Sequence, residues 1–180
     1  DDLKGSKKAV NKLISSGCKH IAIITTRDYV SVGKLRTQGY LEALNENLIS
    51  PESDLILKVE NDAISDNDLS QLEKEIEDLF KKNKNIDGVF AVNEFYALAA
   101  MKVLRKLKKK VPEQVQVIGF TDGVLSRHAT PSLTTISQHA QQMGEKSAEL
   151  LINNLEREDE EDYFKTVVIE TELIERNSTK

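Results

Sequence analysis

The fold is decided by one strand that runs directly into a helix, at residues 89–107, which read VFAVNEFYALAAMKVLRKL. The first four residues form an unbroken apolar run, which is typical of a parallel strand covered on both faces. Asn93 follows at once, and a helix is expected over residues 94–107. The stretch therefore predicts one β–α unit of a covered sheet.

The same alternation continues on both sides of this unit. Apolar runs predict further strands, and amphipathic periods predict further helices. Expected strands lie at 21–24, 55–59 and 115–120, and expected helices lie at 3–16, 35–45 and 69–80. Because strands and helices take turns regularly, we expect right-handed βαβ units in an α/β fold, an open parallel sheet flanked by helices.

The last third of the chain departs from this rhythm. Residues 121–131 look turn-like, 133–136 briefly extended, 140–155 helical and 164–174 a long strand. Residues 156–162 carry six acidic residues and one arginine, a composition that predicts an exposed loop. We therefore expect a different kind of structure after residue 120.

Composition narrows the class of protein. A chain of 180 residues can bury about 70% of the surface that its unfolded form exposes, which is enough for one sizeable core. The formal net charge of −5 argues against a surface built mainly to grip nucleic acid. The single cysteine, Cys18, cannot form an intramolecular disulfide and fits a reducing compartment. With no run near the roughly 20 apolar residues of a membrane span, the expectation is a cytoplasmic protein.

Motifs for cofactors and catalysis are missing from the sequence. No Gly-rich dinucleotide fingerprint and no phosphate-binding loop follow any expected strand. His20, His128 and His139 show no metal-ligand spacing with Cys18, and no serine lies in a nucleophile elbow. The sequence thus predicts a protein without a cofactor, a metal or catalytic activity.

Polar residues follow the expected strands at the point where each strand ends. Ligands of open α/β sheets bind beyond the carboxyl ends of the strands, where loops and helix N-termini converge. These positions hold Thr25, Thr26, Glu60, Asn61, Asp62, Asn93, Glu94, Thr121 and Asp122, and Arg36 lies near the start of the next helix. The planar donors of an arginine suit hydroxyl groups or a carboxylate. Ligand-binding residues are therefore expected at Arg36, Asn93, Thr121 and Asp122.

Each of these residues also has a structural interpretation. Asn93 directly precedes a helix and could be its N-cap, and Arg36 could be a solvated charge or a surface ion pair. Thr121 and Asp122 could simply form the Thr-Asp-Gly turn. The basic residues within 102–110 could suggest a nucleic-acid patch, but cations at a helix C-terminus complement the helix dipole, so a solvated face is favoured.

Six segments in the same order resemble the effector domain of the LacI/GalR family. They are the helix at 2–17, RTQGY at 36–40, GVFAVN at 88–93, VIGFTD at 117–122, PSLTTISQ at 131–138 with Gly144 beyond it, and LIERNST at 173–179. The resemblance implies the type I periplasmic-binding-protein fold, in which two α/β lobes enclose the effector. Only the second lobe and the final return are matched. The implied division is 1–130 for the second lobe, 131–168 for a crossover, helix and strand of the first lobe, and 169–180 for a return strand.

The resemblance also implies a function. Such a chain would be the ligand-sensing domain of a DNA-binding transcriptional regulator, taking a sugar or sugar derivative in the inter-lobe cleft and signalling allosterically. DNA would be contacted through an N-terminal head outside these residues, and the parent protein would be a homodimer. Arg36 and Asn93 occupy positions that commonly hydrogen-bond the effector, whereas Thr121 replaces a usual acidic residue and Asp122 is acidic.

Two other functions stay open on the sequence. One is a periplasmic sugar-binding protein of a transporter, which has the same fold. The other is an enzyme on a flavodoxin-like sheet, for which the strand ends offer only Glu60, Asp62, Glu94 and Asp122, without a recognisable partner. The resemblance further implies that residues 140–155 and part of 164–174 pack on the first lobe. Without it, we expect the chain to self-associate, to swap elements or to fold these segments back onto its own sheet.

Overall fold

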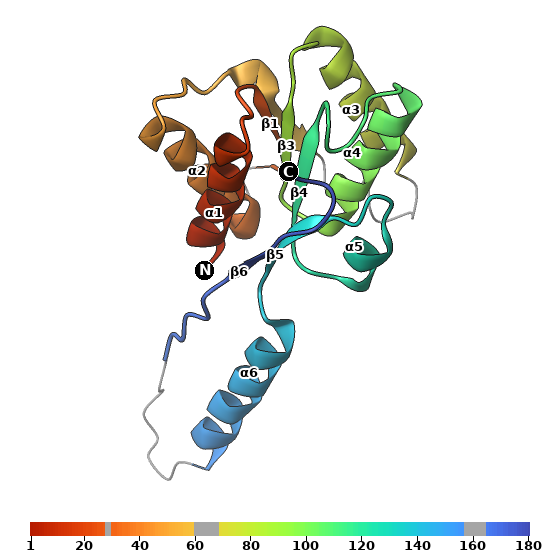
Figure 1. Cartoon of the computed structure of the whole chain (residues 1–180). Helices are drawn as coiled ribbons and strands as arrows, with labels where there is room; N and C mark the ends of the chain where they lie inside the picture. Colours follow the sequence, from red (N-terminus) through yellow and green to blue (C-terminus); the bar gives the residue numbers. More distant parts are fainter. Residues whose placement is uncertain (28–29, 60–68, 157–164) are drawn as a thin grey trace.

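A computed structural model describes residues 1–27, 30–59, 69–156 and 165–180 (Figure 1). Its centre is a six-stranded sheet with the strand order β2-β1-β3-β4-β5-β6. The strands are β1 (Ile21–Thr26), β2 (Ile56–Val59), β3 (Gly88–Ala91), β4 (Gln116–Phe120), β5 (Thr134–Ser137) and β6 (Glu172–Ile174). Strands β1 to β5 are parallel, and β6 runs antiparallel to β5. The open, mostly parallel sheet confirms the expected α/β fold.

Helices cover both faces of this sheet. α1 (Asp2–Ser15) and α2 (Ser31–Glu46) lie together on one side, and α3 (Ser70–Lys82) and α4 (Glu94–Lys106) lie on the other (Figure 1). All four run against the strand direction, so α2 and α4 begin near the carboxyl edge of the sheet, where β1 and β3 end. This arrangement brings helix N-termini to the edge at which the sequence predicts a ligand site.

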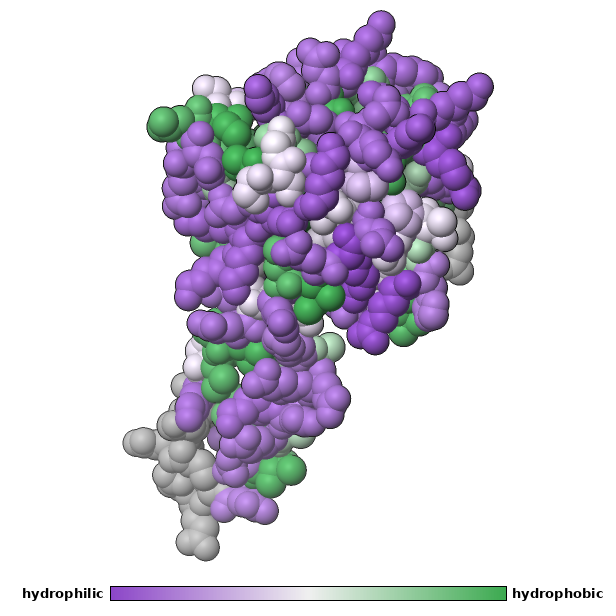
Figure 2. Space-filling model, viewed as in Figure 1, coloured by the Kyte–Doolittle hydropathy of each residue, from purple (hydrophilic) through white to green (hydrophobic). Residues whose placement is uncertain are grey.

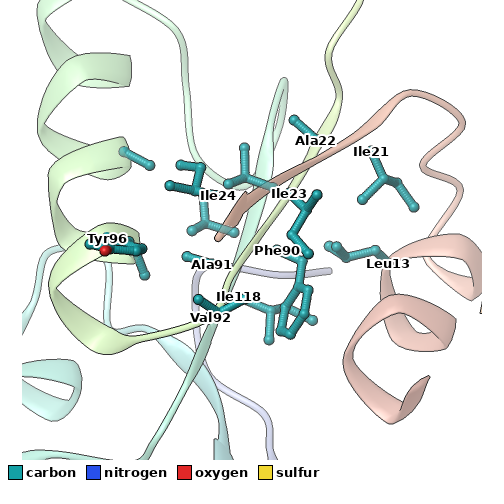
Figure 3. Packing of buried hydrophobic residues seen from close by; sticks show 14 of the residues in the cluster. Leu13, Ile21, Ala22, Ile23, Ile24, Phe90, Ala91, Val92, Tyr96 and Ile118 are labelled. Carbon is teal, nitrogen blue, oxygen red and sulfur yellow. The ribbon is translucent and has the colours of Figure 1, made fainter. Parts of the chain in front are cut away.

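The core fills the space between the sheet and the two helix layers. Strands β3 and β4 are buried along their whole length, which explains their unbroken apolar runs. Figure 3 shows Leu13 of α1 and Tyr96 of α4 approaching the sheet from opposite sides, with Phe90 and Ile118 between them. The core therefore fixes the positions of both helix layers relative to the strand ends.

Two expectations for the last third are wrong in detail. Residues 121–131 contain a short helix, α5 (Val124–His128), rather than turns alone. The long strand expected over 164–174 is only β6, and Phe164 lies outside the described residues. A strand exists only where it has a neighbour, and β5 offers partners to residues 172–174 alone.

Helix α6 (Ala140–Leu155) spans the residues expected for it but points away from the rest of the body (Figure 1). None of its residues is buried, and Leu151 and Leu155 are 60% and 74% exposed. Of the three outcomes expected for this segment, folding back onto its own sheet is not the one that the structure shows, whereas self-association and swapping of elements stay predictions. No helix in the described part of the chain is long and apolar enough to cross a membrane.

Candidate functional site at the carboxyl edge of the sheet

Arg36 reaches the carboxyl edge of the sheet because α2 starts close against the end of β1. Gly33 makes this close approach possible, since a Cβ atom added there would lie 1.7 Å from the Thr26 hydroxyl oxygen. Arg36 follows one turn later on the inner face of α2 and is only 5% exposed. The interpretation of Arg36 as a solvated charge is therefore wrong.

The guanidinium of Arg36 has three partners. Its Nε and Nη2 atoms lie 2.8 Å and 2.7 Å from one carboxylate oxygen of Asp2, and Nη1 donates a hydrogen bond to the carbonyl of Val92. The guanidinium carbon also lies 3.6 Å from the centre of the Phe120 ring. Burial lowers the pKa of Arg36, and the Asp2 carboxylate counteracts that effect. The arginine is thus a fixed, charge-compensated donor group between β3 and β4.

Asn93 is the N-cap of α4. Its Oδ1 accepts a hydrogen bond of 2.8 Å from the backbone N–H of Tyr96, so the N-cap interpretation is confirmed. Its side chain is partly exposed, and its Nδ2 donates no hydrogen bond within the residues that the structure describes. Capping uses the oxygen only, which leaves the amide N–H groups of Asn93 available beside the carbonyl that Arg36 contacts.

Thr121 and Asp122 follow β4 and point to different partners. Thr121 has a positive φ of 87° and donates a hydrogen bond of 3.0 Å to the side-chain oxygen of Gln138. Asp122 accepts hydrogen bonds from Thr135 at 3.0 Å and from Arg176 at 2.5 Å, and its other oxygen lies 3.1 Å from Arg127. Thr121 therefore faces the crossover after β5, whereas Asp122 ties the C-terminal segment to the sheet.

The charges around Asp122 determine its protonation. Burial pushes the pKa of this carboxyl up, but the hydrogen bonds from Arg176, Thr135 and Arg127 outweigh burial and hold the pKa below its ordinary value. Asp122 is therefore an anion whose two oxygens both have partners. Glu94, which follows the end of β3, also has partners for its carboxylate, because one of its oxygens accepts hydrogen bonds from the backbone N–H and the hydroxyl of Ser126.

The structure brings Arg36, Asn93 and Thr121 to one place. Arg36 contacts the carbonyl before Asn93 and the ring before Thr121, so the three residues surround the ends of β3 and β4. Sequence reasoning missed Asp2 and Gln138. Asp2 lies in the first turn of a helix, where an acidic residue is favourable for the helix dipole alone. The sequence therefore contains no signal that Asp2 forms an ion pair with Arg36.

The other strand-end residues contribute less to this place. Thr25 is buried and its hydroxyl pairs with that of Thr37 at 2.8 Å, inside the β1–α2 junction. Glu60, Asn61 and Asp62 lie outside the described residues. In the described ranges no three His, Cys, Asp or Glu side chains gather as a possible metal site. Besides the paired carboxylates of Asp122 and Glu94, this edge offers hydrogen-bonding amides, hydroxyls and the charge-compensated guanidinium of Arg36.

A cavity of about 710 Å³ adjoins this edge, between the body and α6. Its body side includes Asp2, Leu35 and Gln138, and its α6 side includes Met143, Leu150 and Val167. Gln138 links the cavity to Thr121 through their hydrogen bond. Polar and apolar side chains occur on both sides of the cavity, so it can hold a small molecule that carries both hydroxyl groups and carbon faces.

Comparisons with known proteins place this geometry in a family. Residues 10–179 match the model of the periplasmic binding protein-like domain. The chain is 33% identical over 178 residues to the HTH-type transcriptional regulator CelR of Thermobifida fusca, covering 99% of this chain and 50% of that protein. The ribose operon repressor of Halalkalibacterium halodurans is 30% identical over 177 residues, covering 98% of this chain and 50% of that protein. The chain spans about half the length of the curated relatives it matches.

Solved structures agree with these relatives. A complex of the transcriptional regulator CelR with cellobiose superposes with a TM-score of 0.87 at 30% identity, covering 99% of this chain and 52% of that one. A LacI-family sugar-binding transcriptional regulator from Escherichia coli, complexed with phosphate, gives a TM-score of 0.82 at 28% identity, covering 99% and 61%. The chain belongs to the periplasmic binding protein-like domain family and corresponds to the effector-binding portion of LacI-type transcriptional regulators.

Proposed function

We propose that this chain senses a small polar effector, a sugar or sugar derivative, for a DNA-binding regulator of the LacI type. The observation that carries the proposal is the fixed guanidinium of Arg36 at the ends of β3 and β4, beside the uncommitted amide N–H groups of Asn93. Donors that are already oriented lose little entropy when they hydrogen-bond hydroxyl groups. The relatives named as a regulator complexed with cellobiose and as a ribose operon repressor support a sugar.

Four residues bind the effector in this proposal. Arg36 and Asn93 donate to its hydroxyl oxygens, and Thr121 contributes a hydroxyl where relatives of this type carry an acidic residue. Asp122 reaches the effector through the oxygen that faces Arg127, because Arg127 is exposed and can move aside, while the oxygen bonded to Arg176 keeps its structural partner. The site has no catalytic group in this account, so the effector leaves unchanged.

The effector site lies in a cleft between this lobe, residues 1–130, and a first lobe. Residues 131–168 form the crossover, which begins with β5 in the sheet of this lobe and leads through α6 to the first lobe, and residues 169–180 return to the second. Effector binding favours one arrangement of the two lobes, and that preference passes through a homodimer to a DNA-binding head, in the cytoplasm. Coupling of this kind requires different affinities of the effector for the two arrangements. The exposed face of α6 supports the crossing, since it lacks cover from the described residues.

The test begins with a two-lobe protein that carries this chain. A thermal-shift screen against neutral sugars, sugar phosphates and nucleobases identifies the effector, because a ligand that binds only the folded state raises the melting temperature. Calorimetry then compares the wild type with Asn93→Ser. Serine keeps the N-cap but removes the amide donors, so affinity should fall by about 1–3 kcal/mol, roughly 5- to 150-fold, at unchanged stability.

A matched control changes an asparagine away from the edge. Asn45→Ser, on the exposed end of α2, should leave both affinity and stability unchanged. If Asn93→Ser binds the effector as tightly as the wild type, Asn93 does not contact it. If no sugar-like compound in the screen shifts the melting temperature, the proposed effector class is wrong.

A further inference from the structure

The edge of the sheet opposite the candidate site gathers two basic segments. α3 and α4 run side by side, joined by ion pairs of 2.6 Å from Lys102 to Glu73 and from Lys106 to Glu77. Both helices therefore end at the amino edge of the sheet, at the top of Figure 1. Lys109 closes the gap between the two ends, since its Nζ lies 3.5 Å from the carbonyl of Lys84.

We call these residues the basic edge. Its members are Lys81, Lys82, Lys84, Arg105, Lys106, Lys108, Lys109 and Lys110. Lys81 and Lys106 are paired with Glu77. The other members form no ion pair with a residue that the structure describes, and all but the half-buried Lys109 are exposed. Six cations thus have no direct ion-pair partner there, on a chain whose net charge is −5.

Nearby negative charge reduces this excess but does not cancel it. Glu113 and Asp54 are exposed on neighbouring loops, Asp87 follows Lys84 in the loop before β3, and Asp78 lies 3.8 Å from Lys81, which it shares with Glu77. The C-termini of α3 and α4 contribute roughly half a negative charge each. Complementing two helix dipoles requires about one cation in total, so most of the basic edge is not explained by that role.

We propose that the basic edge binds nucleic acid through the phosphodiester backbone, independently of base sequence. Electrostatic binding of this kind needs only a cluster of cations that displaces counterions from the phosphates. Seven of the eight members are lysines, which act as point charges, whereas reading of bases relies on bidentate contacts that arginine provides best. The surface therefore fits the backbone rather than the bases.

An acidic protein partner fits this surface less well. The cores of protein interfaces are depleted in lysine and enriched in aromatic side chains. None of the large apolar side chains that the described residues expose belongs to 81–84 or 105–110. The corresponding end of the body is mostly hydrophilic in Figure 2. A surface of cations without apolar anchors matches protein–DNA interfaces, which are more polar and more basic.

The basic run at 102–110 alone favours a solvated face, because cations at a helix C-terminus complement the helix dipole. The structure adds the second segment, residues 81–84, which lies beside it although more than 20 residues separate the two in sequence. The basic edge lies at the opposite end of the strands from Arg36 and Asn93. The proposal is therefore independent of the proposed effector site.

Fluorescence anisotropy of a labelled 30-base-pair duplex of random sequence, titrated with the 180-residue chain, tests the proposal. Binding should weaken with a slope of log K against log salt of about −3.6 if four phosphates are contacted, which is about 150-fold between 50 and 200 mM salt. The variant Lys82→Gln, Lys84→Gln, Lys108→Gln, Lys110→Gln should lose at least tenfold in affinity at 50 mM salt and show a flatter slope. Duplexes of unrelated sequence should bind equally.

A control variant removes the same charge elsewhere. Lys4→Gln, Lys34→Gln, Lys74→Gln, Lys165→Gln changes exposed lysines outside the basic edge and should bind DNA like the wild type. Equal loss in both variants would mean that net charge alone matters and would overturn the proposal, as would absence of binding up to about 100 µM protein at 50 mM salt. Displacement of the duplex by a short polyglutamate at equal charge concentration would assign the basic edge to acidic proteins instead.

Discussion

Removing Asp2 should destabilise the protein much more when Arg36 is present than when it is replaced. The side chains of Arg36 and Asp2 are 6% and 22% exposed, and Arg36 is otherwise enclosed by Phe120 and the Val92 carbonyl. Breaking a buried ion pair from one side typically costs 3–5 kcal/mol, and the partial exposure of Asp2 reduces this to about 2.5 kcal/mol for Asp2→Ala. In an Arg36→Met background the same change should cost about 0.5 kcal/mol, the contribution of an acidic residue in the first turn of a helix.

The coupling free energy between the two positions is therefore expected to be about 2 kcal/mol. Urea denaturation of the wild type, both single variants and the double variant, followed by circular dichroism, measures it, provided that the slopes of the four transitions agree. A coupling below about 0.5 kcal/mol would refute the reasoning, because it is the value of an exposed ion pair. It would mean that Arg36 is solvated and not fixed at the strand ends.

Three further predictions concern stability and reactivity. The folded state lowers the pKa of Asp122, so the stability that its ionised carboxylate contributes is present above the ordinary pKa and is lost as the pH falls below about 4. Asp122→Asn should therefore lower the free energy of unfolding by about 1–2 kcal/mol at pH 7 and by much less at pH 2.5. Urea denaturation at both pH values measures the difference. Burial raises the pKa of Cys18 to about 12, so a thiol reagent at pH 8 should label it only after unfolding; fast labelling of the folded protein would contradict the burial. Gly33→Ala should lower stability by about 1–3 kcal/mol, and adding Thr26→Ala should restore most of it by removing the hydroxyl that the new methyl meets; a Gly33→Ala protein as stable as the wild type in thermal unfolding would disprove the close approach.

The fold was predictable where local pattern and tertiary structure agree. Residues 89–92 are buried, as their apolar run predicts. Helix α6 spans the same residues as the expected helix. The prediction of a long strand over 164–174 was wrong although residues 167–169 are apolar and β-branched, because a strand forms only beside a partner with free hydrogen-bonding groups. The extent of a strand that pairs with residues distant in sequence cannot be predicted from the segment itself.

The candidate site was predictable in position but not in its contacts. The carboxyl edge follows from the alternation of strands and helices, and Arg36, Asn93 and Thr121 do meet there. That Asp122 instead binds Arg176, which is 54 residues away, could not be derived from the sequence. Asp2 was missed for the same reason, since only the packing of α1 against α2 brings it to Arg36.

The central claim is that the effector binds at the carboxyl ends of β3 and β4, and hydrogen–deuterium exchange tests it most directly. In a two-lobe protein that carries this chain, saturation with the sugar found by the screen should slow exchange of the backbone amides at residues 92–96 and 120–123. The amino edge, including residues 81–84 and 105–110, should exchange at unchanged rates. Protection confined to other segments, or none at either strand end at saturating sugar, would contradict the account.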